Sequence, residues 1–293
     1  MLRRKIWSFL QTPVNSTVVS LSFVLTTGTV AAAVTTGFDG INNYGSPQNC
    51  YFGNRGGASY VTNLNDQLNN NPPVGLPPFF SNVFLWLNEL AWESDLHQNG
   101  QVNQVEFFAF AGHGLATLSE LGNNAAAHFS AQNSSSLPYH TSSQEYLDSV
   151  NAKWDEVRFT YTKWASFYSC NWLSNFGSTA AQTKINNMFQ GLRIMTGFAS
   201  IMYLDSREAY TYGYELRNNY TVKNAWFDAA QQYQPQLAPS ANTDGKVKAR
   251  VNGYRYAESD TLFSNVSNAP TYNNAPNDFY SWTISIPTTG QVF

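Results

Sequence analysis

Three short, almost wholly apolar segments place the strongest constraint on how this chain folds. They are Val105–Ala111, Trp164–Tyr168 and Ile194–Leu204. Uninterrupted apolar runs that are rich in aromatic residues and bounded by turn residues are typical of strands buried on both faces. Such strands occur mainly in parallel sheets whose two faces are covered by helices. The runs therefore predict an α/β fold.

Helical patterns alternate with these runs. Apolar residues recur at helical spacing in Ala58–Leu68, Ala180–Leu192 and Val222–Tyr233. Phe84–Trp92 suits either a strand or a helix, and Asn123–Ser143, which is rich in Ala, Asn and Ser, is predicted to be a loop. The alternation of strands and helices favours a mainly parallel sheet.

The length of 293 residues is sufficient for one large domain or two small ones. We expect a single α/β domain over residues 34–293, with a core at 34–234 and an irregular C-terminal extension at 235–293. Within this extension, Lys248–Tyr256 and Tyr280–Ile286 have the composition of strands.

The first residues have the layout of a secretory signal peptide. Arg3-Arg4-Lys5 precede a charge-free stretch, and Ala31 and Ala33 supply a cleavage pattern of the A-x-A type. The paired arginines also fit a twin-arginine export signal. A retained membrane anchor is the alternative, but the apolar stretch is shorter than the roughly 20 residues that a spanning helix needs. We therefore expect residues 1–33 to be removed and an exported protein without a stable membrane anchor.

Charge and composition exclude several classes of protein. Aromatic residues make up 15% of the chain and charged residues 12%, which is not the composition of a disordered chain. The formal net charge is -3, and loss of residues 1–33 leaves 13 Lys and Arg (16 minus 3) against 19 Asp and Glu, or -6. No stripe of Lys or Arg is present. Neither nucleic acid nor an anionic membrane is therefore an expected partner.

The first two apolar runs are followed by residues that can carry chemistry. Gly112-His113-Gly114 follow one run and Ser169-Cys170 follow the next. The carboxyl ends of parallel strands meet at one edge of a sheet, so His113 and Cys170 are expected at the same edge. A thiol nucleophile needs a neighbouring group that transfers protons, and histidine serves this purpose. The backbone N–H groups of Gly114 and Cys170 are candidates for stabilising an oxyanion.

Other kinds of site have weaker support. A disulfide between Cys50 and Cys170, the two cysteines of the chain, would block the nucleophile and remains an open alternative. Glu89, Glu93 and Asp95 resemble the carboxylates of a glycoside hydrolase, but their closeness on one short segment favours an exposed face. The spacing of the histidines matches no zinc motif, so we expect no metal and no cofactor; these residues are His97, His113, His128 and His140.

The two strand-end motifs carry a resemblance to a known group of enzymes. A hydrophobic strand that ends in His-Gly, followed by one that ends in a small residue and Cys, resembles the caspase, gingipain and legumain group of cysteine peptidases. The resemblance covers Val105–Gly114 and Trp164–Asn171 directly. More loosely, four further segments look like an uncharacterised family of secreted bacterial proteins that shares this core: Phe38–Tyr44, Trp86–Asp95, Phe189–Asp205 and Val251–Tyr254.

The resemblance implies a fold and a mechanism. The fold would be a caspase-like three-layer α/β/α sandwich. His113 would be the general acid and base, Cys170 the nucleophile, and the amides of Gly114 and Cys170 the oxyanion site. The substrate would be a peptide or protein, and this chemistry requires no metal or cofactor. The alternative is a non-catalytic secreted binding protein that keeps the same fold.

The sequence departs from the peptidases next to the cysteine. Ser169 stands where they usually have Ala, and the bulky Asn171-Trp172 follow Cys170. In the peptidases, two segments form the pocket for the residue before the scissile bond. The corresponding segments here contain both acidic and basic residues, so the preference for a basic, acidic or neutral substrate side chain stays open. These candidate substrate-binding residues are Asp39 and Arg55 in one segment, and Asp205 and Arg207, followed by Glu208, in the other.

Overall fold

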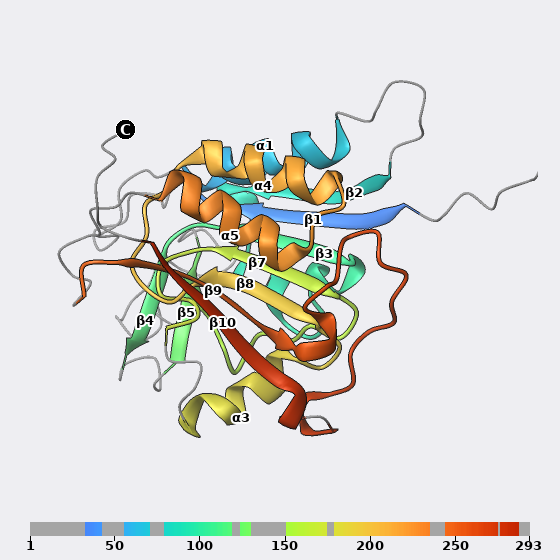
Figure 1. Cartoon of the computed structure of the whole chain (residues 1–293), viewed down its shortest axis with the longest axis vertical. Coiled ribbons are helices and arrows are strands. Elements are labelled where there is room, and N and C mark those ends of the chain that lie inside the picture. Colours follow the sequence, from blue (N-terminus) through green and yellow to red (C-terminus); the bar gives the residue numbers. More distant parts are fainter. Residues whose placement is uncertain are drawn as a thin grey trace, which may run out of the picture. The chain divides into compact units, whose positions relative to one another are not determined.

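The computed structural model describes residues 33–42, 56–70, 79–118, 124–129, 151–174, 179–234, 244–274 and 276–286 (Figure 1). The described residues, from Ala33 onward, form one compact unit. The predicted signal peptide up to residue 32 lies outside the described residues, as do residues 43–55 and 71–78. Among the described helices, none has both the length and the apolar character needed to cross a membrane.

A seven-stranded mixed sheet forms the centre of this unit, in the order β10-β9-β8-β7-β3-β1-β2. Strands β8, β7, β3, β1 and β2 run parallel, whereas β9 and β10 are antiparallel to their neighbours. The predicted α/β class with a mainly parallel sheet is therefore confirmed. The strands are β1 (Val34–Gly40), β2 (Phe80–Leu87), β3 (Phe107–Ala111), β7 (Trp164–Tyr168), β8 (Ile194–Phe198), β9 (Val247–Tyr254) and β10 (Phe279–Ile286).

The three apolar runs supply the central strands β3, β7 and β8, and every residue of these strands is buried. Because both faces of these strands are covered, their sequences are continuously apolar instead of alternating. The third run differs from the prediction at its end. Strand β8 stops at Phe198, and residues 199–205 leave the sheet before the next helix.

Three helices lie side by side over one face of the sheet, and a fourth lies away from them, below the strands in Figure 1. The three are α1 (Gly57–Asn69), α4 (Ser206–Arg217) and α5 (Val222–Tyr233), and the fourth is α3 (Thr179–Met188). The helices predicted at 58–68 and 222–233 are confirmed. The helix predicted over 180–192 ends at Met188, and α4 has no counterpart in the sequence prediction.

Short 3-10 turns connect several of these elements. Three of them, η1, η2 and η3, lie between β2 and β3, and the others follow β9. Their bounds are η1 (Asn88–Leu90), η2 (Glu93–Leu96), η3 (Gln101–Gln104), η5 (Arg255–Ala257), η6 (Tyr272–Asn274) and η7 (Pro276–Asp278). The segment 84–92, which was open between strand and helix, is therefore the end of a strand followed by a 3-10 turn.

Two sequence predictions need correction. The stretch 123–143 is not entirely loop, because Asn124–His128 form strand β5 of a second, antiparallel sheet. That small sheet also contains β4 (Gly114–Leu118) and β6 (Asn151–Lys153). The C-terminal region is not an irregular extension either, since β9 and β10 complete the main sheet. Pairing with β8 satisfies backbone groups that would otherwise be exposed at an edge.

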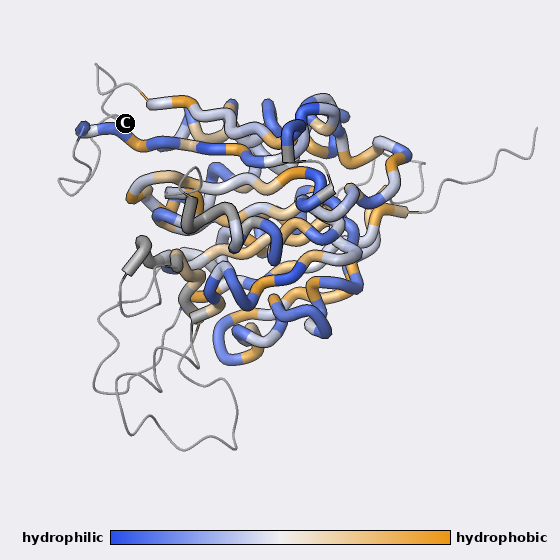
Figure 2. Tube along the Cα trace, turned by 90° about the horizontal axis from the view of Figure 1, so that it is seen from below, coloured by the Kyte–Doolittle hydropathy of each residue, from blue (hydrophilic) through white to orange (hydrophobic). Residues whose placement is uncertain are grey.

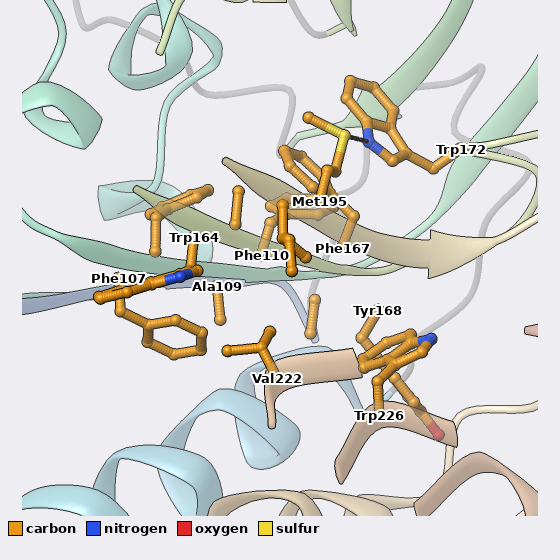
Figure 3. Close-up of a cluster of buried hydrophobic side chains, with 14 of the residues drawn as sticks. Phe107, Ala109, Phe110, Trp164, Phe167, Tyr168, Trp172, Met195, Val222 and Trp226 are labelled. Atoms are coloured by element: carbon orange, nitrogen blue, oxygen red, sulfur yellow. Dashed lines mark hydrogen bonds between the residues drawn. The ribbon is translucent and has the colours of Figure 1, made fainter. Parts of the chain in front are cut away.

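Aromatic side chains fill the core on both sides of the central strands. Phe167 stacks on Trp172 with ring centroids 4.2 Å apart, and the next residue, Tyr168, stacks on Tyr60 at 3.8 Å. Figure 3 shows Phe167, Met195 and Trp172 on one side of the strands and Tyr168 on the other, as the alternation of side chains along a strand requires. Figure 2 shows the hydrophobic residues concentrated along these central strands.

Candidate active site

The parallel strands β1, β3 and β7 end level with one another. Gly40 pairs with Ala111, and Ala111 pairs with Tyr168, so the last residues of the three strands are neighbours. Two backbone hydrogen bonds continue this alignment beyond the strands. The N–H of Ile41 donates to the carbonyl of Ala111 at 2.9 Å, and the N–H of Gly112 donates to the carbonyl of Tyr168 at 3.2 Å. The segments that begin at residues 112 and 169 therefore leave the sheet together.

A pocket of about 610 Å³ lies at this edge of the sheet. Both His113 and Cys170 line it, and each side chain is half-buried. The remaining lining residues come from the start of α1, from the loops after β3 and β7, and from the segment after β8: Gly56, Gly112, Gly114, Asn171, Ile201, Met202, Tyr203 and Leu204. The pocket therefore brings together the two residues for which the sequence predicts chemistry.

Direct contact between the two strand-end loops explains why residue 114 is a glycine. A Cβ atom added at Gly114 would lie 2.0 Å from the carbonyl oxygen of Cys170 and 2.2 Å from Oγ of Ser169. Cβ atoms in proteins do not approach backbone oxygens so closely. Any larger residue at position 114 would therefore push the loop after β3 away from the loop after β7. The absence of a side chain at Gly114 sets the separation of His113 from Cys170.

The sulfur of Cys170 lies against the backbone of Met202. The N–H of Met202 donates to Sγ at 3.4 Å, and Sγ lies 3.6 Å from the carbonyl oxygen of the same residue. Asn171, the next residue, has a φ of 56°, and its N–H donates to the carbonyl of Ser200 at 3.0 Å. Among residues other than glycine, asparagine is one of those that best tolerate this left-handed conformation. The resulting turn directs the chain from Cys170 back into the fold.

The N-terminus of helix α1 borders the same pocket through Gly56, which precedes the first helical residue. Asn42 supplies the cap that the helix lacks at Gly56, because its Oδ1 accepts the N–H of Ala58 at 2.7 Å and that of Ser59 at 3.4 Å. The partial positive charge at a helix N-terminus favours nearby anions. A thiolate in this pocket would be stabilised by it.

A buried hydrogen-bond network holds the wall formed by residues 201–204. The hydroxyl of Tyr168 donates to Oε2 of Glu208 at 2.7 Å, and Nε2 of Gln234 donates to the same oxygen at 2.7 Å. Gln234 also fixes the backbone of Tyr203, accepting its N–H at 3.0 Å and donating to its carbonyl at 2.8 Å. Burial raises the pKa of Glu208 to about 8, against the opposing effect of the hydrogen bonds from Gln234 and Tyr168.

Asp39 does not occupy the position expected of a substrate-binding residue. It lies within β1, is completely buried and is not among the residues that line the pocket. Burial, and next the charge of Asp95, raise the pKa of Asp39 well above its usual range. The expectation that Asp39 contacts a substrate is therefore wrong for this structure. Its position in β1, one residue before the last of the strand, places it inside the fold, below the rim.

The other candidate substrate-binding residues lie next to the pocket or outside the described residues. Asp205 caps helix α4 by accepting the N–H of Arg207 at 2.9 Å, and the side chains of the two residues pair at 2.6 Å. Neither lines the pocket, although Leu204, the residue before them, does. Arg55 and Cys50 lie outside the described residues. The alternative of a disulfide between Cys50 and Cys170 therefore falls on a residue outside the described part of the chain.

The three carboxylates between β2 and β3 are not a uniform exposed face. Glu89 is exposed, but Glu93 and Asp95 are buried. The cause is the tight turn η2, in which the N–H of Trp92 donates to Oδ2 of Asp95 at 2.7 Å and holds this side chain against the fold. The prediction that these acids are all solvated is wrong for two of them.

Sequence reasoning missed the pocket wall at 201–204 and the network that supports it. The apolar character of Ile201–Leu204 resembles the strand before it, so the pattern extends the strand too far. Glu208 and Gln234 are ordinary helix residues by sequence, and only the fold joins them to Tyr168. Asn171 is the one local signal, because asparagine is enriched at left-handed turns.

Comparison with known proteins identifies a family. No curated protein matches the sequence. Residues 41–286 match the family described as a domain of unknown function, DUF6345. This match covers most of the chain, including the main sheet from β2 to β10 and every residue that lines the pocket. The chain therefore belongs to the DUF6345 family.

Proposed function

We propose that this protein is an exported cysteine peptidase-like hydrolase that cleaves amide bonds in a peptide or protein with His113 and Cys170. The observation that carries the proposal is that both residues line one pocket at the carboxyl edge of a mainly parallel sheet. Ligands of such sheets bind at this edge. The proposed relationship to the caspase-like three-layer sandwich is supported by the His-Gly after β3 and the Ser-Cys after the adjacent β7.

The proposed reaction has two halves. The Cys170 thiolate attacks the carbonyl carbon of the amide, and the negative charge that develops on the carbonyl oxygen is stabilised by the N–H groups of Gly114 and Cys170. His113 donates a proton to the leaving amine as the C–N bond breaks, which leaves a thioester on Cys170. His113 then takes a proton from a water molecule, which attacks the carbonyl carbon of the thioester. The C–S bond breaks, the carboxylic acid leaves, and Cys170 is restored as the thiolate.

The surroundings of the sulfur support a nucleophilic role. The N–H of Met202, 3.4 Å from Sγ, and the N-terminus of α1 at the same pocket favour the thiolate, whereas the carbonyl oxygen of Met202, 3.6 Å from Sγ, favours the thiol. The proposal also places the mature chain outside the cytoplasm. Arg3-Arg4-Lys5 and the Ala31-x-Ala33 pattern support export, by the secretory or the twin-arginine route.

Covalent labelling tests the proposal. The mature chain is treated with iodoacetamide, or with a peptidyl acyloxymethyl ketone, and the modified residue is located by mass spectrometry. We expect one equivalent of label on Cys170, and labelling at least about tenfold slower in His113→Ala, because the thiolate is the reactive form and a neighbouring imidazolium favours it over the thiol. Cys50→Ser is the matched control, since it removes the other cysteine and should label at the wild-type rate.

Three results would contradict this function. If Cys170 of the folded protein stays unreactive until a reductant is added, the cysteines form a disulfide and the site is a scaffold. If Cys170 is reduced and still unreactive, or if it reacts equally fast in His113→Ala, the non-catalytic binding protein replaces the enzyme.

A further inference from the structure

A second group of side chains with ligating atoms lies apart from the pocket. Glu93 begins the turn η2, His97 follows that turn directly, and Glu156 lies shortly after strand β6. One ligand atom from each of the three residues lies within 4.8 Å of those of the other two. None of the three lines the pocket that contains Cys170. We propose that Glu93, His97 and Glu156 bind a divalent transition-metal cation such as Zn²⁺.

The ligand set suits this class of cation. An imidazole nitrogen with two carboxylate oxygens is a common set for zinc and its neighbours, whereas Ca²⁺ takes six to eight oxygen ligands. Ligands about 2.1 Å from a tetrahedral ion are about 3.4 Å apart. Nε2 of His97 and Oε1 of Glu93 are 2.6 Å apart, so they need to separate by less than 1 Å as the ion replaces the proton between them.

Burial and charge around the group favour a cation. The side chain of Glu93 is 10% exposed and that of Glu156 is 29% exposed, so their mutual repulsion is only partly screened by water. Lys153 pairs with Glu156 at 3.0 Å, which supplies one positive charge. The His97 side chain is 40% exposed, so a bound ion would be reached from solvent and would complete its coordination with water.

The position of the group suggests what the ion does. It would join the segment 93–97 to the turn after β6. Strand β6 pairs with β5, and β5 pairs with β4, which begins at Gly114 beside His113. The ion would thus stabilise the small sheet, whose first strand begins at the pocket residue Gly114. Its role would be structural, and it would take no part in the proposed reaction.

Zinc binding to the mature chain tests this proposal. The parent is the double variant Cys50→Ser/Cys170→Ser, so that no thiolate can hold the ion and the outcome is independent of the proposed hydrolase. After dialysis against a chelator, Zn²⁺ is added, and bound metal is measured by equilibrium dialysis with elemental analysis, alongside the thermal unfolding midpoint. We expect one equivalent of zinc and a midpoint that rises with zinc concentration, with no rise for the same concentration of Ca²⁺.

Single substitutions then locate the ion. Glu93→Gln and His97→Gln are each expected to weaken zinc binding by at least about tenfold, and Glu89→Gln, an exposed acid on the same segment, is the matched control that should bind as the parent does. Lys153→Met removes the cation that competes for Glu156, so it should strengthen zinc binding. This variant gives a result even where a ligand substitution prevents folding. A parent that binds no zinc, equal affinity in the Gln variants, or weaker binding in Lys153→Met would each overturn the proposal.

Discussion

At the scale of single residues, the pocket depends on close backbone approach more than on any one side chain. Gly114 lets the His113 loop lie directly against the carbonyl of Cys170. Asn171 turns the chain immediately after the sulfur with a φ of 56°. Both residues permit a main-chain path that most other residues would not. Their substitution would therefore move His113 and Cys170 relative to each other without removing either side chain.

Gly114→Ala tests this directly. The added methyl group would meet the Cys170 carbonyl oxygen at 2.0 Å, and backbone cannot move aside as a flexible side chain can. We expect a loss of about 3 kcal/mol or more in the free energy of unfolding, measured by urea denaturation, together with slower alkylation of Cys170. Gly56→Ala is the control from the same pocket, because nothing lies within 4 Å of its added Cβ. Equal losses in the two variants would show that close approach at Gly114 is not what matters.

At the scale of elements, helices α4 and α5 support the pocket wall that follows β8. Glu208 lies in α4, Gln234 follows the last residue of α5, and the two meet at the hydroxyl of Tyr168 at the end of β7. Because Gln234 holds both backbone groups of Tyr203, the position of the wall depends on how these two helices pack.

This arrangement predicts how stability changes with pH. The pKa of Glu208 is about 8 in the folded protein, above its usual value of 4.5, because burial disfavours the carboxylate. The folded state therefore binds this proton more tightly, so the contribution of Glu208 is complete below about pH 4.5 and is lost as the pH rises through about 8. Glu208→Gln cannot ionise, and its free energy of unfolding should fall less steeply between pH 5 and pH 8.

Urea denaturation across this pH range measures the difference. Glu89→Gln, on an exposed 3-10 turn, should keep the wild-type slope. A Glu208→Gln slope that matches the wild-type slope would mean that this carboxyl group is already ionised in the folded protein.

The elements differ in how far they can be predicted from sequence. Strands β3, β7 and β8 are predictable because burial on both faces leaves a continuous apolar signal. The small sheet is not, since β5 reads Asn-Ala-Ala-Ala-His, which has neither β-branched nor aromatic residues. Helix α4 is missed because its buried face is made of Glu208, Ala209, Tyr212, Gly213 and Leu216, a set without a clear apolar stripe.

The candidate site, too, can be predicted only where its residues belong to a local sequence pattern. His113 and Cys170 are found because each follows an apolar strand, and strand ends can be located from local sequence. The wall at Tyr203 and its support are not found, because they depend on hydrogen bonds between residues as far apart as Tyr168 and Gln234. Local patterns carry no information about such pairings.

At the scale of the whole molecule, a buried ion pair joins the centre of the sheet to the C-terminal region. Arg193 precedes β8, and its side chain donates twice to Asp260, at 2.6 and 2.9 Å. Nε1 of Trp164 in β7 donates to the same carboxylate at 3.0 Å, and the backbone carbonyl of Asp260 accepts the N–H of Val222 at the start of α5. This single residue therefore connects two strands, a helix and the chain beyond β9.

Asp260→Ala should accordingly destabilise the entire fold. Removing one partner leaves the Arg193 charge buried without compensation, which costs about 3–5 kcal/mol in the free energy of unfolding. Asp244→Ala is the matched control, because its ion pair with Lys248 is exposed and should contribute little. Chemical denaturation of both variants measures the loss in the free energy of unfolding relative to the wild type. A loss no larger in Asp260→Ala than in Asp244→Ala would refute this role.

The pocket draws its lining from four stretches of chain that begin at Gly56 and end at Leu204. No one of them forms a cavity alone, and they meet only after β1, β3, β7 and β8 have found their places in the sheet. The pocket therefore depends on contacts between segments that are far apart in the sequence, and such contacts form slowly. A misfolded copy would carry His113 and Cys170 on separate segments that do not meet, so under the proposed function it would have no hydrolase activity.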